Sequence, residues 1–148
     1  MMDKRLGAVF MLHGLGHLLG IDTHDPGGYP KGLDRPKEPG LCSLRTVREL
    51  KENMVITVEP GCYFISALLA PAMESSDTSK FFISEAIRRF MGFGGVRIES
   101  DVYLTSTGCK NMTNVPRKIW EIEAVMEGAK WPLEKGLHHS LNGMVNSH

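Results

Sequence analysis

The chain has 148 residues, of which 42% are hydrophobic and 7% aromatic, and 17 Lys and Arg balance 17 Asp and Glu to a formal net charge of zero. These values are typical of one globular domain, which at this length buries roughly two thirds of its unfolded surface without disulfide or metal support. The neutral balance disfavours a nucleic-acid partner bound through phosphate neutralisation.

Membrane insertion and disulfide support are disfavoured as well. No stretch approaches the roughly 20 consecutive apolar residues of a membrane span. The charged and apolar start of the chain is not interpreted as a signal peptide, because His13 and His17 end the apolar run and no A-x-A site follows. The three cysteines cannot all pair within the chain and show no C-x-x-C spacing, so we expect a reducing compartment and a cytoplasmic location.

The first part of the chain alternates apolar residues with glycine and histidine. Between residues 6 and 24, Gly14, Gly16 and Gly20 make a continuous helix costly, so we expect extended structure with close backbone packing. Residues 25–40 are rich in proline and glycine and predict an ordered surface loop, of a length that is often functional.

Strand and helix patterns then alternate irregularly. Residues 53–65 predict a strand through Val58 that is broken at Pro60 and Gly61, with Asn53 in a left-handed turn before it. Residues 77–90 have helical spacing, with Gly92 as the expected stop.

Two further strands and a helix complete the predicted elements. The strands lie in the segments VRIES and DVYLTSTG, with a turn at residues 105–108, and a second amphipathic helix spans 116–128. From residue 130 on there is little periodicity, and we expect the histidines there to be solvated. Because the elements do not alternate as in a doubly wound sheet, the pattern favours an α+β fold.

Three of the six histidines, His13, His17 and His24, lie within twelve residues. Metal binding and ordinary half-buried histidines are both compatible with this cluster. Glu59 ends an apolar strand, where an unpaired carboxylate would be costly, and Glu99 repeats the situation after Val96–Ile98. Glu99 by itself indicates a salt bridge to a cation such as Arg97, but two strand-end carboxylates with a histidine cluster indicate a divalent metal.

Five blocks in order resemble the prolidase (Xaa-Pro dipeptidase) family of pita-bread metallopeptidases: HGLGHLLGIDTHD, EPGLCSLRT, MVITVEPGCYF, GFGGVRIESDV and VPRKIWEIEAVM. The resemblance covers about residues 6–128. It implies the second half of a pita-bread fold, a curved and mostly antiparallel sheet with flanking helices. Residues 1–129 would be the C-terminal portion of a catalytic domain and 130–148 a tail.

The resemblance also implies a site of two adjacent divalent metal ions, usually Mn²⁺, which supply a hydroxide near neutral pH. His17, Glu59 and Glu99 match metal ligands of the family, Glu99 being the ligand that bridges both ions. Glu59 would additionally carry a proton to the leaving proline nitrogen.

The substrate of the family is an Xaa-Pro dipeptide, and two positions match residues that contact it. His24 matches a histidine that contacts substrate and steadies the tetrahedral intermediate. Arg45 matches the arginine that grips the free carboxylate. Arg97 resembles a hydrogen-bonding partner of the bridging glutamate. The family also implies a homodimer.

This sequence departs from the family at its start. The two aspartate ligands of the family lie before the HGLGH block, whereas here twelve residues precede His13 and the only acid among them is Asp3. The 148 residues therefore offer three of five ligands, and we expect little or no dipeptidase activity from this chain alone. Two alternatives remain, an aminopeptidase P-like enzyme acting on longer peptides and a non-catalytic pita-bread module that binds peptides or partners.

Overall fold

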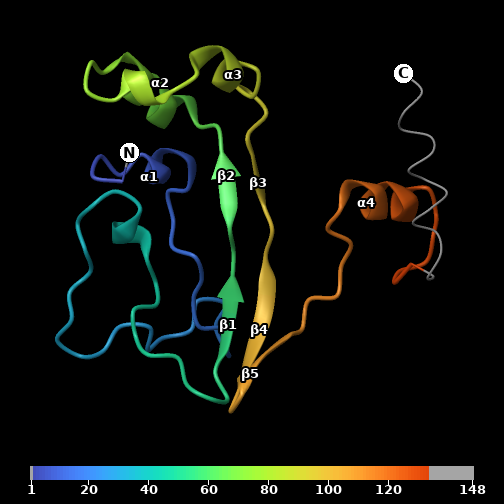
Figure 1. Ribbon diagram of the computed structural model, residues 1–148. Coiled ribbons are helices and arrows are strands. Elements are labelled where there is room, and N and C mark those ends of the chain that lie inside the picture. Colours follow the sequence, from blue (N-terminus) through green and yellow to red (C-terminus); the bar gives the residue numbers. More distant parts are fainter. Residues whose placement is uncertain (1, 134–148) are drawn as a thin grey trace. The chain divides into compact units, whose positions relative to one another are not determined.

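A three-stranded antiparallel sheet forms the centre of the first of two compact units, residues 1–112, in the computed structural model (Figure 1). The structure describes residues 2–133. The strand order is β1 (Val55–Val58), β4 (Ser100–Thr105) and β5 (Gly108–Asn111). Thr57 lies opposite Asp101, and the β4–β5 hairpin turns where the sequence predicts it.

The predicted strand over residues 53–65 is confirmed, with its break. β1 ends at Val58, and β2 (Gly61–Tyr63) continues after Glu59 and Pro60 to pair with β3 (Gly95–Arg97) in a second, two-stranded sheet. Asn53 has a φ of 69°, the left-handed turn that the sequence predicts before the strand. The break leaves Glu59 between the two sheets, at a point where neither ladder fixes its side chain.

The glycine-rich segment around residues 14–20, which comes before β1 in the chain, runs beside β1 in extended form. Backbone hydrogen bonds join Leu19 N to Val55 O at 3.0 Å, Thr57 N to His17 O at 2.9 Å and Glu59 N to Leu15 O at 2.6 Å. A Cβ atom on Gly16 would lie 1.8 Å from the Thr57 carbonyl oxygen, so only glycine allows this approach. The predicted close backbone packing is confirmed here. The extended structure predicted from residue 6 is wrong over Gly7–Phe10, which form one helical turn, α1.

The helix predicted over residues 77–90 is wrong over most of its length. Only α3 (Ser84–Arg88) is α-helical, after a short 3₁₀ turn, η2 (Ser79–Phe81), and an extended Phe82. Ile87 is the buried residue among the apolar residues whose spacing predicts this helix, and it lies on α3. The stop at Gly92, with a φ of 86°, is confirmed as a left-handed turn.

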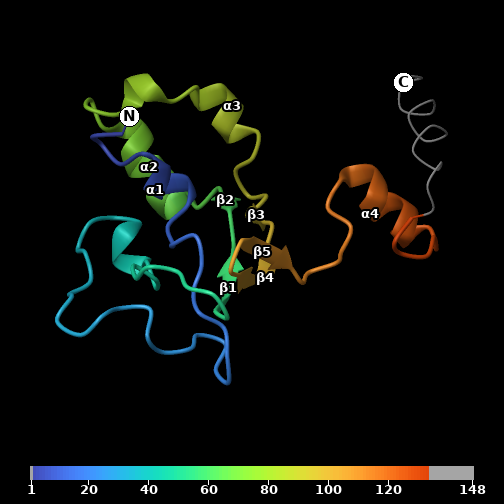
Figure 2. The same cartoon turned by 60° about the horizontal axis from the view of Figure 1, so that its bottom comes forward.

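The sequence pattern misses α2 (Ser66–Glu74), which contains Pro71. Leu69 on this helix is fully buried, so tertiary packing compensates for the proline. α1 packs against α2 and β2 at one end of the strands (Figure 2). There the Phe64 and Phe90 rings stack with centroids 4.9 Å apart, and Phe10 meets Phe64 edge-on.

The long loop is confirmed, since residues 25–40 form neither helix nor strand and lead into a 3₁₀ turn, η1 (Leu41–Ser43). In the second unit the predicted helix at 116–128 is confirmed as α4 (Ile119–Met126). The Glu121 carboxylate accepts hydrogen bonds from the Arg117 and Lys118 backbone amides and so closes its first turn. The predicted tail lies mostly outside the described residues.

The buried set is unusually polar for so small a unit. Among residues 2–133, the buried hydrophobic side chains include Leu6, Leu69 and Val102, while His17, Thr57 and Glu59 are equally buried. Buried polar groups persist only when they are paired, so we expect these three side chains to have polar partners. No helix in this range is long and apolar enough to cross a membrane, and all three cysteines are free and exposed.

Candidate metal centre

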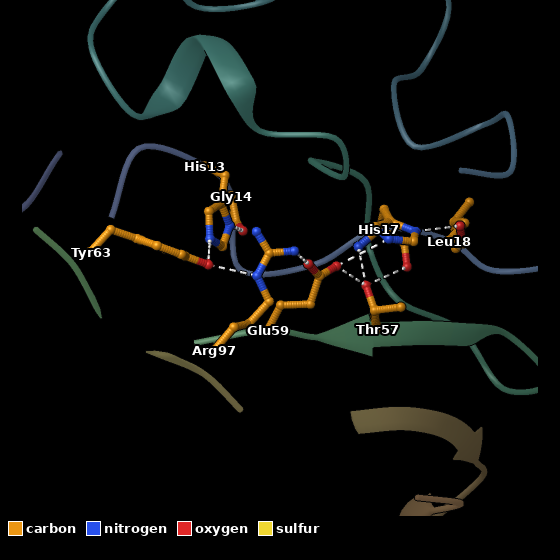
Figure 3. Close-up of polar contacts among 8 residues, drawn as sticks. All are labelled: His13, Gly14, His17, Leu18, Thr57, Glu59, Tyr63 and Arg97. Carbon is orange, nitrogen blue, oxygen red and sulfur yellow. Dashed lines mark hydrogen bonds and ion pairs between the residues drawn. The ribbon is translucent and has the colours of Figure 1, made fainter. Parts of the chain in front are cut away.

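His17 and Glu59 face each other across the backbone ladder between the glycine-rich segment and the end of β1 (Figure 3). His17 Nε2 lies 3.0 Å from Glu59 Oε1, and each side chain is only 7% exposed. The register explains the contact, because Thr57 N binds His17 O and Glu59 N binds Leu15 O. The sequence predicts both residues as ligands, and the fold brings them together.

Thr57 joins these two groups and is absent from the sequence predictions. Its hydroxyl accepts a hydrogen bond from the His17 backbone amide at 2.9 Å and donates one to Glu59 Oε1 at 2.5 Å. Thr57 is 2% exposed. Strand alternation places positions 57 and 59 on one face, and this signal could have identified the threonine.

The orientation of the His17 ring decides which nitrogen faces Glu59. Its Nδ1 lies 2.9 Å from the Leu18 carbonyl oxygen, and a carbonyl can only accept, so Nδ1 carries a hydrogen. In the neutral ring Nε2 then presents a lone pair to a carboxylate oxygen. A lone pair and a carboxylate oxygen repel each other unless a proton or a cation lies between them. A metal ion held by both atoms would supply such a cation.

A chain of hydrogen bonds extends from Glu59 to His13 (Figure 3). Arg97 Nη1 lies 2.9 Å from Glu59 Oε2, and Arg97 Nε donates to the Tyr63 hydroxyl at 2.6 Å. The same hydroxyl lies 2.8 Å from His13 Nε2, while His13 Nδ1 lies 2.7 Å from the Gly14 carbonyl oxygen. The carbonyl fixes the hydrogen on Nδ1, so Tyr63 donates to His13 and accepts from Arg97.

The hydrogen bond to Tyr63 raises the pKa of Arg97; partial desolvation opposes the rise, and the charges of Glu59 and Glu99 add to it. The guanidinium is therefore a permanent positive charge beside the site. The family resemblance predicts Arg97 as a partner of Glu99; the structure shows an ion pair of Arg97 with Glu59, and the charge of Glu99 also acts on Arg97. The sequence offered no assignment for Tyr63, although strand alternation from Glu59 would have placed it nearby.

Glu99 completes a group of three possible ligands. One ligand atom from each of His17, Glu59 and Glu99 lies within 4.8 Å of the others. Glu99 is exposed, whereas the other two are buried. One imidazole nitrogen and two carboxylates suit a hard or borderline divalent ion.

His24 and Arg45 lie beside this group, at a cavity of about 280 Å³. Its lining comprises His13, Gly14, Gly16, His17, His24, Ser43, Arg45, Glu59 and Arg97. The His24 and His17 ring centroids are 4.4 Å apart at an interplanar angle of 70°. Desolvation lowers the pKa of His24, and so do the positive charge of Arg45 and the neighbouring His17, while the carboxylates of Glu59 and Glu99 oppose this shift.

Comparisons with known proteins identify the family and the fold of the chain. Residues 2–106 match the model of metallopeptidase family M24. The Xaa-Pro dipeptidase of Homo sapiens is 57% identical over 128 residues, 86% of this chain and 26% of the relative. The probable Xaa-Pro aminopeptidase pepP of Penicillium rubens is 39% identical over 125 residues, 84% of this chain and 26% of the relative. The chain thus spans about a quarter of the length of these relatives.

Solved structures give the same fold. Aminopeptidase P from Escherichia coli, determined with the inhibitor Pro-Leu, matches with a TM-score of 0.54 and 33% identity over 85% of this chain and 22% of that one. Aminopeptidase PepP of Pseudomonas aeruginosa matches with a TM-score of 0.57 and 32% identity over the same shares. With the mixed helices and antiparallel sheets, these matches confirm the predicted α+β, pita-bread type of fold.

Proposed function

The chain belongs to metallopeptidase family M24, and on that premise we propose that it supplies metal-binding and substrate-binding residues for the hydrolysis of Xaa-Pro dipeptides. The observation that carries the proposal is the gathering of His17, Glu59 and Glu99 within 4.8 Å, beside a cavity that Arg45 and His24 line. Relatives called Xaa-Pro dipeptidase are 56–57% identical to the chain, against 39–42% for those called aminopeptidase.

We infer that His17, Glu59 and Glu99 are metal ligands and that the ion is Mn²⁺, a metal which carboxylate and imidazole ligands suit. The Nε2 atom of His17 and the two carboxylates fit such an ion, because one ligand atom from each residue lies within 4.8 Å of the others. A bound divalent ion polarises a carbonyl and lowers the pKa of water. Thr57 and Arg97 hold the Glu59 carboxylate from two sides and so fix how it faces the cavity.

In this proposal the chain's own residues bind and orient the dipeptide. The Arg45 guanidinium matches a carboxylate in two parallel hydrogen bonds and so holds the C-terminal end. The lowered pKa of His24 favours its neutral ring, which can donate or accept one hydrogen bond at the reacting carbonyl. Glu59 is the candidate carrier of a proton to the leaving nitrogen. We also propose that the full-length enzyme is a homodimer and that it is located in the cytoplasm.

Metal binding by the 148-residue chain tests the ligand assignment. We expect one Mn²⁺ per chain at most, with binding weakened about tenfold or more by Glu59→Gln and by Glu99→Gln. The exposed carboxylate Glu49 gives the matched control, because Glu49→Gln removes the same charge away from the cluster. Calorimetric titration measures both quantities. Two equivalents per chain, or equal affinity in all variants, would contradict the assignment.

Activity tests the function itself. We expect the 148-residue chain to turn over Gly-Pro little or not at all, because its described residues bring together three of the five ligands that the family resemblance implies. We expect a chimera, in which this chain replaces the matching quarter of the human Xaa-Pro dipeptidase, to hydrolyse Gly-Pro and to lose that activity on Glu59→Gln. A folded, metal-loaded chimera without activity would contradict the function. Clear, chelator-sensitive turnover by the chain alone would contradict the ligand count.

The similarity to solved aminopeptidase P structures supports one second candidate, cleavage of longer Xaa-Pro peptides. In the chimera, Arg45→Ala should reduce cleavage of a dipeptide far more than cleavage of a pentapeptide if Arg45 binds the C-terminal carboxylate. Equal effects on both peptides would favour the aminopeptidase. The presence together of His17, Glu59 and Glu99 argues against a non-catalytic module, which has no need of them.

A further inference from the structure

We propose that Tyr29 and Arg35, on the long proline- and glycine-rich loop, are positioning residues that hold Arg45 ready for a substrate carboxylate. The proposal rests on the function proposed above and extends it to a loop that the catalytic residues leave unexplained. It begins from a carbonyl group, that of Leu44, which directly precedes Arg45 in the chain.

Two side chains of the loop donate hydrogen bonds to this one carbonyl. The Tyr29 hydroxyl lies 2.9 Å from the Leu44 carbonyl oxygen, and Arg35 Nη1 lies 2.7 Å from it. The Arg35 guanidinium also lies over the Tyr29 ring, 4.7 Å from its centroid. Each donor therefore steadies the other, and together they fix the plane of the peptide group between Leu44 and Arg45.

The backbone at Leu44 and Arg45 contacts other backbone segments on both sides. A Cβ atom on Gly28 would lie 2.0 Å from the Arg45 carbonyl oxygen, and the Val47 amide donates to the Gly28 carbonyl at 3.0 Å. On the other side, a Cβ atom on Gly14 would lie 2.9 Å from Leu44 Cα. The chain at Leu44 and Arg45 thus passes between the loop and the segment that carries His17, and glycines make both approaches possible.

Such anchoring matters for an exposed arginine. A free arginine side chain has many rotamers, and it loses this freedom when it is held in one geometry. Fixing the peptide group before Arg45 limits the directions in which the Arg45 side chain can leave the backbone. Less conformational entropy is then lost when Arg45 binds a carboxylate. Arg35, Arg45, His17 and His24 line a common cavity of about 220 Å³, so the anchored side chain begins at the site.

Arg35 could instead bind the substrate carboxylate itself. Comparing variants of Tyr29 and of Arg35 distinguishes this direct role from the positioning role. Tyr29 carries no charge, and Tyr29→Phe removes only the hydroxyl that holds the Leu44 carbonyl. If the loop acts by positioning, Tyr29→Phe and Arg35→Gln have the same kind of effect, and the double variant is little worse than either single one. If Arg35 binds the carboxylate, only its own substitution changes binding.

The test uses the metal-free 148-residue chain, titrated with glycyl-proline and with glycyl-prolinamide while amide NMR signals are followed. The wild-type chain should bind the acid more tightly than the amide, and Arg45→Ala should remove this preference. We expect Tyr29→Phe and Arg35→Gln each to weaken binding of the acid roughly three- to tenfold, the value of about one hydrogen bond. Binding of the amide should stay unchanged, and Arg35→Lys should recover part of the loss.

Two further measurements make the outcome decisive. Hydrogen exchange at the Val47 amide should quicken in both loop variants, because its acceptor lies on the loop. Tyr103→Phe is the matched control, since it removes a tyrosine hydrogen bond to Asn53 away from the cavity. A preference for the acid that persists unchanged in both loop variants would overturn the positioning role alone. A wild-type chain that binds acid and amide equally would overturn the carboxylate grip and, with it, this inference.

Discussion

Replacing Thr57 by valine tests the physical basis of the site most directly. Valine has nearly the same shape as threonine and suits a strand, so the change removes the hydroxyl with little effect on packing. Two hydrogen bonds are lost, the one that the hydroxyl accepts from the His17 amide and the one that it donates to the Glu59 carboxylate. Because Thr57 is 2% exposed, water cannot replace them.

The expected cost follows from these two losses. An unsatisfied buried amide costs about 1–3 kcal/mol, and a hydrogen bond to a charged group contributes about 1.5–3 kcal/mol. The better packing of a methyl group offsets part of the sum, so we expect the free energy of unfolding to fall by about 3 kcal/mol. Against a total of about 5–15 kcal/mol for an ordinary domain, this is a large fraction.

Urea unfolding of the metal-free chain, followed by circular dichroism, measures this free energy. Thr105→Val is the control, because it makes the same change on β4 outside the site, and we expect it to stay within about 0.5 kcal/mol of wild type. Thr57→Ser, which keeps the hydroxyl, should retain most of the stability. If Thr57→Val costs less than about 1 kcal/mol, or no more than Thr105→Val, the hydroxyl does not hold the site together.

Three other predictions follow from the same contacts. Gly16→Ala should destabilise the chain by about 3 kcal/mol or more in the same assay, because the new methyl group would meet the Thr57 carbonyl at 1.8 Å and separate the strands. By proton NMR of the metal-free chain, His24 should titrate below its ordinary pKa of 6.5, so its share of the stability is present above that pH and is lost as the pH falls; Arg45→Ala should move the midpoint upward. Tyr63→Phe should weaken Mn²⁺ binding by about tenfold, measured calorimetrically, since it breaks the hydrogen-bond chain that leads to the ligands.

The strand that carries Glu59 could be predicted because its signals are local. Val55–Val58 is apolar and β-branched, and Pro60 and Gly61 end any ladder, so a buried carboxylate at that point needed a partner. The glycines around His17 likewise indicated close backbone packing. What the local pattern left open was the partner itself, which depends on the register between two segments forty residues apart.

The helices show where local reasoning fails. Residues 77–90 keep helical spacing of apolar side chains, yet the chain turns at Ser79–Phe81 and only Ile87 becomes buried. α2 contains Pro71, a residue that disfavours a helix interior, yet the helix forms with Leu69 fully buried. In both segments, packing against other elements outweighed propensity, and a single sequence does not record that packing.

The charges around the cluster set how many ions it can hold. With His17 neutral, the two carboxylates of Glu59 and Glu99 and the guanidinium of Arg97 leave one net negative charge. One divalent ion makes the net charge positive by one, which a half-open cavity tolerates. A second ion would bring it to three positive charges, and two more carboxylates would restore the value that one ion gives. Charge and ligand number therefore lead to the same expectation: these three residues should bind one ion weakly, and a pair of ions should need two further acidic side chains beside them.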